Sequence, residues 1–408
     1  MLLALVCLLQ IPQAYTTWDR KEVPPLPLSG LSVVCSTATQ LHRALRTQRS
    51  GTTIVIKDGA YDVSPFEPLT IDSNHVTIRG MPGDPAKVIL TGKGFNYCGM
   101  EEMIILKAAD ATLASFTISE VRGNGLKLQT GNNHNCLLYN MRFLNIGERM
   151  IKGPGVAVSR NWEIRYCHFE DTKVAPAVRC GESATDSSGD YIAGMDIMNS
   201  DSWVIHDCVF RNIRGPAGDA RGGIFFWGGK AGHANTNVTV ERNTFIGCDR
   251  AISFGNPSGT SDINGGVIRN NFIVRGCGIG IEMEHCTNVK VLNNTLYSSD
   301  AAYFRSVYFD ANPSGNEFRN NIIFGMIKGN VQSMANNINK TLVPDTSANW
   351  FANITTADLH LTAAAAQAIN TGTAGLVIDD WDHHARANGQ CDIGADEYGT
   401  INIEKELP

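Results

Sequence analysis

From about residue 135 onward the chain repeats a short pattern: a β-branched or apolar strand, a polar pair, an aromatic or aliphatic residue, and a turn that contains glycine. A period of about 25 residues with strand-type alternation is typical of a parallel β-solenoid, in which each coil buries its inner face against the next coil. The pattern therefore predicts an all-β solenoid. Seven copies end at anchor residues that lie 24 to 41 positions apart, namely Phe143, Phe169, Phe210, Phe245, Phe272, Leu296 and Ile322.

Asparagines recur at a fixed place in the later copies. Two residues before four successive anchors stand Asn243, Asn270, Asn294 and Asn320. Stacking would align these side chains as a ladder whose amides hydrogen-bond to one another and to the turn backbone. Cysteines hold the same position in two earlier copies, Cys167 and Cys208. They could form a disulfide between coils, but we favour a stack of buried thiols.

The two ends of the chain differ from the repeats. Residues 1–16 have the length and apolar character of a secretion signal, although a buried N-terminal segment is the alternative, and we expect no other segment to cross a membrane. An amphipathic helix carrying Leu41 and Leu45, stopped near Gly51, would cap the open end of the solenoid. We therefore expect a β-helix with its N-terminal cap over 17–330 and a C-terminal closing segment over 331–408.

These features resemble a known family. The helix with IVIKDGAY, the asparagine ladder and the coils are similar to the single-stranded right-handed parallel β-helix of the pectate-lyase-like superfamily, over residues 30–330. The tail, from HLTAAAAQAIN through DIGADEY, resembles the endings of secreted bacterial β-helix proteins related to polysaccharide lyases. This resemblance implies the fold. It leaves the activity open, because the fold hosts uronate lyases, hydrolases, epimerases, esterases and noncatalytic adhesins.

Charge and cysteine content restrict the classes of ligand and partner that the chain can bind. The 34 Lys and Arg against 40 Asp and Glu give a net charge of −6, so no basic field is available to hold nucleic acid. The eleven cysteines show no CxxC pair or zinc spacing. We expect a secreted monomer whose partner is an acidic polysaccharide.

The strand after each glycine-containing turn offers an outward row. An inward column of Ile151, Met195, Ile224, Ile252, Ile281 and Val307 predicts that the next residue of each strand points outward. Phe225, Trp227 and Tyr308 would then form an exposed aromatic platform for sugar rings, unless inserted loops cover them. The outward residues are Lys152, Asp196, Phe225, Ser253, Glu282 and Tyr308, and a second row two positions on contains Met198, Trp227, Gly255, Glu284 and Asp310.

Two long intervals between anchors predict inserted loops that wall part of this face. They carry Arg179, Arg214 and Arg221, and Lys152 lies on the adjoining coil. Such a cluster would neutralise a uronate carboxylate, which acidifies the C5 proton, and Lys152 or Arg179 would be the base in β-elimination. Asp196, Arg214, Arg221 and the three aromatics would bind substrate. The alternative is solvated loop arginines that pair with Asp190 and Asp219.

Acidic side chains gather further along the same face. Glu282, Glu284 and Asp310 should lie on neighbouring coils, where they would repel one another unless a cation such as calcium binds or one carboxyl has a raised pKa. Solvated acids are the alternative. The run DDWDHHAR, residues 379–386, looks metal-like, but we favour a structural role because it falls in the closing segment.

The leading hypothesis is a lyase that cleaves a uronic-acid-containing polysaccharide by β-elimination. A glycoside hydrolase that uses Asp196 with Glu282 or Glu284 is the second hypothesis, since paired carboxylates carry that chemistry. A uronate epimerase would use the same basic cluster. The third class is a noncatalytic carbohydrate-binding or surface protein whose repeats build a stiff rod. Calcium is the one cofactor that the sequence brings into consideration.

Overall fold

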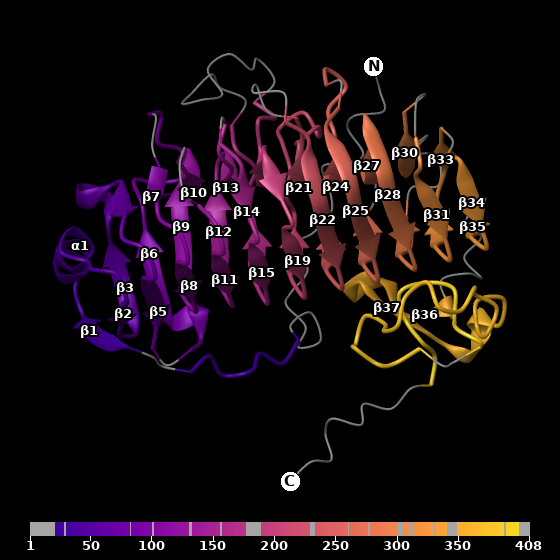
Figure 1. The fold of residues 1–408 in the computed structure, drawn as a ribbon, viewed down its shortest axis with the longest axis horizontal. Helices are drawn as coiled ribbons and strands as arrows, with labels where there is room; N and C mark the ends of the chain where they lie inside the picture. Colours follow the sequence, from indigo (N-terminus) through magenta and orange to yellow (C-terminus); the bar gives the residue numbers. More distant parts are fainter. Residues whose placement is uncertain are drawn as a thin grey trace, which may run out of the picture.

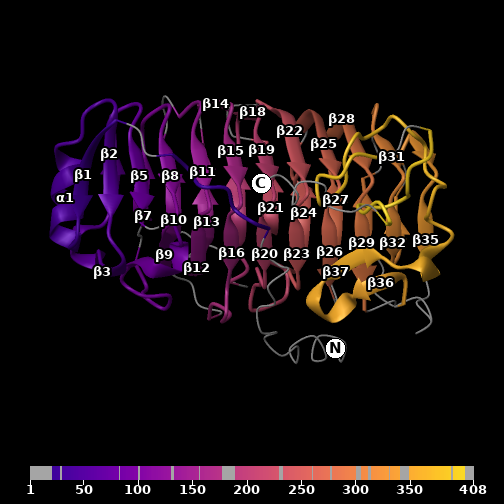
Figure 2. The same cartoon turned by 90° about the horizontal axis from the view of Figure 1, so that it is seen from below.

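The structure is a computed structural model of the whole chain, and its three long parallel sheets wind into one solenoid (Figures 1 and 2). The predicted all-β parallel β-helix is therefore confirmed. The expected signal peptide, residues 1–16, lies outside the described residues. Those residues are 21–27, 30–81, 83–99, 102–129, 133–155, 157–176, 189–228, 233–259, 261–275, 278–299, 305–310, 314–329, 331–340, 349–386 and 389–399.

The first of the three parallel sheets, called sheet I, begins with the first strand of the solenoid. Two short strands, β14 (Ser159–Arg160) and β18 (Ser200–Asp201), pair beside its main path. The main path runs through β1 (Leu31–Cys35), β2 (Thr52–Ile56), β5 (Thr77–Gly80), β8 (Thr112–Ala114), β11 (Leu137–Tyr139), β15 (Glu163–Arg165), β19 (Val204–His206), β22 (Asn235–Glu241), β25 (Ile263–Arg269), β28 (Cys286–Leu292), β31 (Glu317–Arg319) and β34 (Ser333–Ala335).

Sheet II carries the anchor residues of the repeat. Its last strand extends the stacked coils to Lys340, beyond the boundary expected near 330. In order it contains β3 (Gly59–Asp62), β6 (Val88–Thr91), β9 (Thr117–Val121), β12 (Arg142–Ile146), β16 (His168–Glu170), β20 (Val209–Arg211), β23 (Thr244–Ile246), β26 (Phe272–Arg275), β29 (Thr295–Ser298), β32 (Ile322–Phe324) and β35 (Ile338–Lys340).

Sheet III bears the face that the sequence analysis assigned to substrate. Its register follows the predicted inward column throughout, from Ile151 opposite Met195 to Ile281 opposite Val307, and all six inward side chains are buried. It contains β4 (Leu69–Ile71), β7 (Glu102–Leu106), β10 (Asn124–Leu128), β13 (Arg149–Lys152), β17 (Ala193–Ile197), β21 (Gly222–Phe226), β24 (Arg250–Phe254), β27 (Ile279–Met283), β30 (Val307–Phe309) and β33 (Ile327–Lys328).

The core is built from such columns because equivalent side chains of successive coils lie directly on one another. Phe143, Phe169, Phe210 and Phe245 form one continuous stack, with neighbouring ring centroids 4.6 to 5.0 Å apart. Trp162 and Trp203 stack in the same way, with centroids 4.8 Å apart. Each ring therefore buries both faces without a separate hydrophobic layer.

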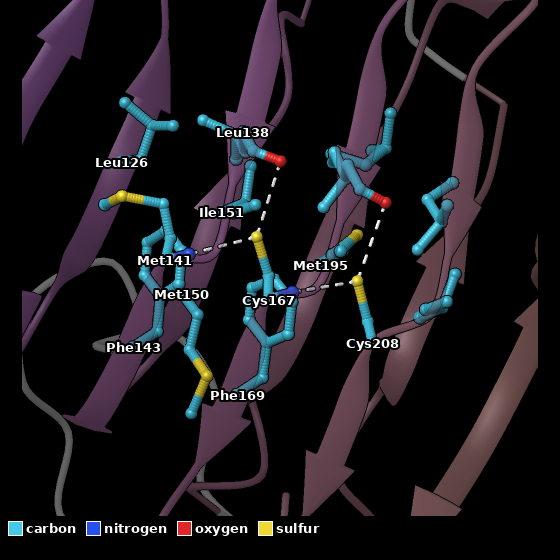
Figure 3. Close-up of a cluster of buried hydrophobic side chains, with 14 of the residues drawn as sticks. Leu126, Leu138, Met141, Phe143, Met150, Ile151, Cys167, Phe169, Met195 and Cys208 are labelled. Atoms are coloured by element: carbon cyan, nitrogen blue, oxygen red, sulfur yellow. Dashed lines mark hydrogen bonds between the residues drawn. The ribbon is translucent and has the colours of Figure 1, made fainter. Parts of the chain in front are cut away.

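The cysteines occupy the predicted column as buried free thiols (Figure 3). The Met141 amide donates to Cys167 Sγ and the Cys167 amide donates to Cys208 Sγ, each over 3.4 Å. The Cys208 amide then donates to Asn243 Oδ1 over 3.0 Å. The column of cysteines thus continues into the asparagine ladder. Both the thiols and the asparagine side chains accept a hydrogen bond from a backbone amide of the preceding coil. Cys98, elsewhere in the chain, is disulfide-bonded.

The ladder differs from the prediction by one residue in two coils. Its asparagines are Asn243, Asn271, Asn294, Asn321 and Asn337, so Asn271 and Asn321 replace the expected Asn270 and Asn320. Asn270 and Asn320 instead adopt φ of 53° and 56°. Asparagine tolerates this left-handed conformation, and a positive-φ residue precedes the ladder position in the other coils too, as Arg242 and Asn293 do, so the ladder residue lies one position later than predicted in these two coils. The anchors shift with it, since Phe245 pairs with Ile273, and Phe272 points outward.

The N-terminal cap forms as predicted. Helix α1 (Ala38–Arg46) starts at Thr37, whose side chain accepts the Gln40 amide, and buries Leu41 and Leu45. Capping by a threonine oxygen satisfies an otherwise unpaired amide of the first turn. Short 3₁₀ turns occur at Ser64–Phe66, Pro85–Lys87, Ile354–Thr356 and Ala363–Ala365.

The C-terminal segment, which we define as residues 349–399, packs on the outer face of sheet II beside the last coils (Figures 1 and 2). It contains the two-stranded sheet of β36 (Phe351–Asn353) and β37 (Asp358–Leu361). Its Trp381 stacks on Phe272 with centroids 4.8 Å apart. The residues before β1 reach this segment too, because Lys21 pairs with Asp207 at 2.7 Å and lies 3.9 Å from the Trp381 ring centroid.

Candidate functional site on sheet III

The predicted outward row forms as one line of residues across sheet III. Lys152 lies opposite Asp196, Asp196 opposite Phe225, Ser253 opposite Glu282 and Glu282 opposite Tyr308. Lys127 precedes Lys152 in the row, and Lys328 follows Tyr308. Adjacent members lie about 4.8 Å apart, so Lys152 and Glu282, four coils apart, are separated by about 19 Å.

Lys152 and Asp196 form the centre of a buried polar cluster. The Lys152 ammonium lies 2.6 Å from Asp196 Oδ2, and the side chains are only 10% and 1% exposed. Trp227 Nε1 donates to the other carboxylate oxygen, Oδ1, over 2.7 Å. The Lys152 ammonium also lies 6.0 Å from the Trp227 ring centroid, at the edge of cation–π range. The partly exposed Trp227 ring therefore adjoins the charged pair.

Arg149 completes this cluster, and the sequence analysis did not select it. Its Nε donates to Asp196 Oδ2 over 3.2 Å, and its Nη1 donates to Glu148 Oε2 over 2.7 Å. Its guanidinium also lies 3.4 Å from the Tyr191 ring centroid, and Arg221 lies 5.8 Å from the same centroid. The sequence signal that could have indicated Arg149 is its place at the start of the strand that carries Lys152.

These contacts keep Asp196 ionised. Burial alone would raise the pKa of the Asp196 carboxyl, but the positive charges of Lys152 and Arg149 and the hydrogen bonds from Lys152 and Trp227 hold it below its ordinary value. A carboxylate between two cations in a nearly dry site can fix the position of both. The cluster therefore holds Lys152 and Arg149 in fixed positions beside an aromatic ring, and Asp196 and Glu148 balance their charges.

The inserted loops distribute their arginines differently from the prediction. Arg221 joins the Lys152 cluster through Tyr191, whereas Arg214 donates to the Gly247 carbonyl over 2.5 Å, at the turn between sheets II and III. Asp219 pairs with Arg250 at 2.7 Å, and Asp190 accepts the Ala217 amide. The expected single basic cluster is therefore divided. Arg179 lies outside the described residues.

The expected continuous platform of exposed aromatics is wrong. Phe225 is only 6% exposed, because its outward face stacks against Trp227 with centroids 6.0 Å apart. Tyr308 is partly exposed but lies three coils away, between Arg305 and Lys328 at 5.6 and 5.7 Å from its ring centroid. Trp227 and Tyr308 thus belong to two separate places on the face.

Glu282, Glu284 and Asp310 come together as expected, and Glu282 and Asp310 have hydrogen-bond partners. Glu282 accepts hydrogen bonds from Arg250 Nε at 3.0 Å and from Ser253 Oγ at 2.9 Å. Asp310 accepts the His285 amide at 2.7 Å. Burial, followed by the charges of Glu282 and Asp310, raises the pKa of Glu284 to about 7. A protonated Glu284 therefore relieves the repulsion, which is one of the two outcomes foreseen from the sequence.

These three carboxylates do not form a preassembled cation site. Among the residues that the structure describes, the groups of three or more His, Cys, Asp or Glu donors within 4.8 Å of one another both lie in the C-terminal segment. They are His360 with Asp382 and Asp396, and Asp380 with Asp382 and His384. Part of the run DDWDHHAR thus belongs to groups that could hold a metal ion, whereas the sequence favours a structural role for it.

Comparison with known proteins agrees with this architecture. A family model described as right handed beta helix region matches residues 102–265. The solved structure of pectate lyase Pel9A is similar at a TM-score of 0.63 and 12% identity, over 91% of this chain and 97% of that chain. A mutant of the PL6-family alginate lyase AlyGC is similar at a TM-score of 0.50 and 17% identity, over 72% of this chain and 38% of that chain. No curated protein sequence matches.

The chain thus has a right-handed parallel β-helix fold that is similar to the fold of pectate lyase Pel9A. Identities this low show the fold alone, so the activity has to be argued from the residues of the site. Within the part of the chain that the structure describes, no helix is both long enough and apolar enough to cross a membrane.

Proposed function

We propose that this protein is a secreted, monomeric polysaccharide lyase that cleaves a uronic-acid-containing polymer by β-elimination at the Lys152 cluster. The observation that carries the proposal is the buried pair of Lys152 and Asp196, with Arg149 on the same carboxylate and Trp227 beside it. The similar structures bear the names pectate lyase and alginate lyase, and those activities are of the same chemical kind.

The proposed reaction uses the residues of this chain alone. Arg221 neutralises the uronate carboxylate, which makes the C5 proton acidic, while Arg149 holds Asp196 in place. Lys152 stands as an ammonium paired with Asp196, so it first releases a proton to solvent; the resulting amine takes the C5 proton, the C4–O bond breaks as a double bond forms between C4 and C5, and the departing oxygen takes a proton from solvent. Asp196 acts as a positioning residue for Lys152. Arg179 remains the alternative base.

The remaining proposed contacts are with the sugar chain. Trp227 would stack on the sugar ring next to the cleaved bond, because it is the partly exposed ring beside Lys152. Tyr308, with Lys328, would contact the polymer about three coils further along. Phe225 and Arg214 would act by holding Trp227 and the inserted loop in place.

The test combines substrate and site. The purified mature protein is incubated with a panel of uronate polymers, with and without calcium, while the ultraviolet absorbance of unsaturated product and the number of reducing ends are followed. Both signals rise for a lyase. Lys152→Met is expected to lower the rate by about 100-fold or more. Lys290→Met, at a surface lysine that is 52% exposed on sheet I, is the matched control and should retain the wild-type rate.

Other results would replace the proposal. If the Lys152→Met variant turned over substrate at the wild-type rate, the reaction would have to take place at another site. Binding of polymer without turnover would indicate a noncatalytic carbohydrate-binding protein, and product of unchanged length with altered uronate configuration would indicate an epimerase. Calcium at the carboxylates Glu282, Glu284 and Asp310 is a proposal that requires these side chains to rearrange. A rate that depends on calcium only when these carboxylates are intact would support it.

A glycoside hydrolase is the second candidate. The pair expected from the sequence, Asp196 with Glu282, is three coils or about 14 Å apart, and one observation favours Glu282 with Glu284 instead. Glu282 is held by Arg250 and Ser253, whereas the pKa of Glu284 is raised to about 7, so two neighbouring carboxyls have opposite environments. Pairs of this kind divide into an acid and a base in glycosidases. Reducing ends without unsaturated product, together with loss of activity in Glu284→Gln, would support this candidate over the lyase.

A further inference from the structure

The C-terminal segment has little regular structure to hold it together. Within its described residues it contains one two-stranded sheet, β36 with β37, and two 3₁₀ turns. Its hydrophobic cluster is separate from the main core and relies on sheet II residues such as Phe272 and Phe324. Small loop-rich units of this kind commonly require a disulfide or a metal ion to fix their loops.

Three potential ligands from distant parts of this segment converge. His360 lies on β37, Asp382 in the loop that follows Trp381, and Asp396 near the end of the described chain. One donor atom from each lies within 4.8 Å of the others. His360 Nε2 is 2.7 Å from Asp382 Oδ2. An ion at this point would connect three separate stretches of chain at once.

The His360 ring is oriented as a ligand would be. Its Nδ1 lies 2.5 Å from Asp358 Oδ1, so the Nδ1 proton is engaged and Nε2 faces Asp382. Metal-binding histidines typically donate their second nitrogen to a carboxylate in this way. The rings of Phe272 and Trp381 meet His360 edge-on, with centroids at 5.1 and 5.3 Å, and hold its plane.

We propose that His360 Nε2, Asp382 and Asp396 bind one divalent transition-metal ion of the Zn²⁺ type, which locks the C-terminal segment. An imidazole together with two carboxylates suits zinc, whereas calcium and magnesium prefer oxygen ligands alone. The ion takes the place of the proton between His360 and Asp382. This site is independent of the proposed lyase function, because it lies in the C-terminal segment, which packs on sheet II, and not on sheet III.

The overlapping group of Asp380, Asp382 and His384 is a poorer site. Asp380 Oδ1 already accepts the amides of Asp382 and His384, at 2.9 and 2.8 Å, and its Oδ2 accepts the Glu397 amide at 3.2 Å. Both oxygens thus shape the loop by binding main-chain groups. We therefore assign the ion to the group that contains His360.

The test uses the untagged full chain, stripped with a chelator and then titrated with ZnCl₂ while binding heat and melting temperature are followed. We expect one equivalent to bind and to raise the melting temperature, and Co²⁺ to give the visible absorption of a site with nitrogen and oxygen ligands. His360→Gln should weaken Zn²⁺ binding by about 100-fold or more, and Asp358→Asn, which leaves all three ligands in place, by about 10- to 100-fold.

Two further variants make the assignment falsifiable. His75→Gln alters a histidine that is 61% exposed and 3.8 Å from Asp110 at the other end of the molecule, and it should bind Zn²⁺ as the wild type does. His384→Gln should also retain binding. The proposal would be overturned if the stripped wild type showed no saturable Zn²⁺ binding; His360 would then be a charged bridge between two aspartates. It would also be overturned if binding were retained in His360→Gln but lost in His384→Gln.

Discussion

The ion pair between Lys152 and Asp196 should be strongly coupled, and a double-mutant cycle can measure this. At 2.6 Å the attraction between two unit charges is about 6 kcal/mol at an effective dielectric constant of about 20, before desolvation is subtracted. Asp196→Asn leaves two buried cations without their carboxylate, so it should lower the free energy of unfolding by about 4 kcal/mol. Lys152→Met should lower it by about 3 kcal/mol, because Arg149 still pairs with Asp196.

The double variant should then cost about 2 to 3 kcal/mol less than the sum of the single variants. Unfolding in urea, followed by circular dichroism, provides the four free energies. Asparagine is a suitable replacement because its amide oxygen can still accept from Trp227 Nε1, which lies 2.7 Å from Oδ1. The matched control is the exposed pair of Lys290 and Glu317, 3.6 Å apart, for which the coupling should be about 0.5 kcal/mol or less.

The pH dependence has a defined sign. The pKa of Asp196 is lowered in the folded protein, so the contribution of the pair is complete above the ordinary carboxyl pKa and is lost as the pH falls through the folded value. The coupling energy should therefore shrink in acid. A coupling no larger than that of Lys290 with Glu317 at neutral pH would refute the argument that burial strengthens this pair.

Three further predictions concern the ladder, the acidic row and the thiols. Asn271→Ala should lower the free energy of unfolding by about 3 kcal/mol, because it removes hydrogen bonds to Val240, Arg269 and two ladder asparagines. Asn337→Ala, at the end of the ladder, should lower it by about half as much. Equal urea midpoints for the two variants would contradict this. The melting temperature of the wild type should fall as the pH rises from about 4.5 to about 7, because in this range only the folded state retains the proton on Glu284. Glu284→Gln should abolish this fall. Parallel pH profiles of the two proteins would exclude the raised pKa. Cys208 should resist a thiol reagent in the native protein and react after unfolding, as peptide mapping would show; rapid native labelling would mean that the column opens.

Much of the fold could be predicted because the solenoid repeats one local pattern. The inward column from Ile151 to Val307 matches the register of sheet III at every step, and α1 buries the two leucines expected of it. The prediction slipped by one residue at Asn270 and Asn320. In both coils two asparagines are adjacent, and the first takes the positive-φ turn position that precedes every ladder residue. Its side chain then binds Asp379 or Thr373 of the C-terminal segment.

The candidate site was less predictable than the fold. Lys152 and Asp196 could be assigned to one outward row because alternation along a strand is a local property. Arg149 could not be, because its guanidinium reaches Asp196 from the start of the strand and lies over Tyr191, a residue of the inserted stretch. Phe225 has the outward position that was predicted, yet Trp227 covers it.

By itself, the sequence determined the period, the inward columns, the capping helix and the order of charges along the exposed face. These follow from residue type and spacing, which act over a few positions or between equivalent positions of adjacent coils. Only the tertiary structure decided which charges meet. Lys152 pairs with Asp196 across 44 residues, and the side chains of His360 and Asp396 converge within a segment without a repeat. Such contacts depend on the conformations of the loops, and loops have no repeating pattern from which a contact can be predicted.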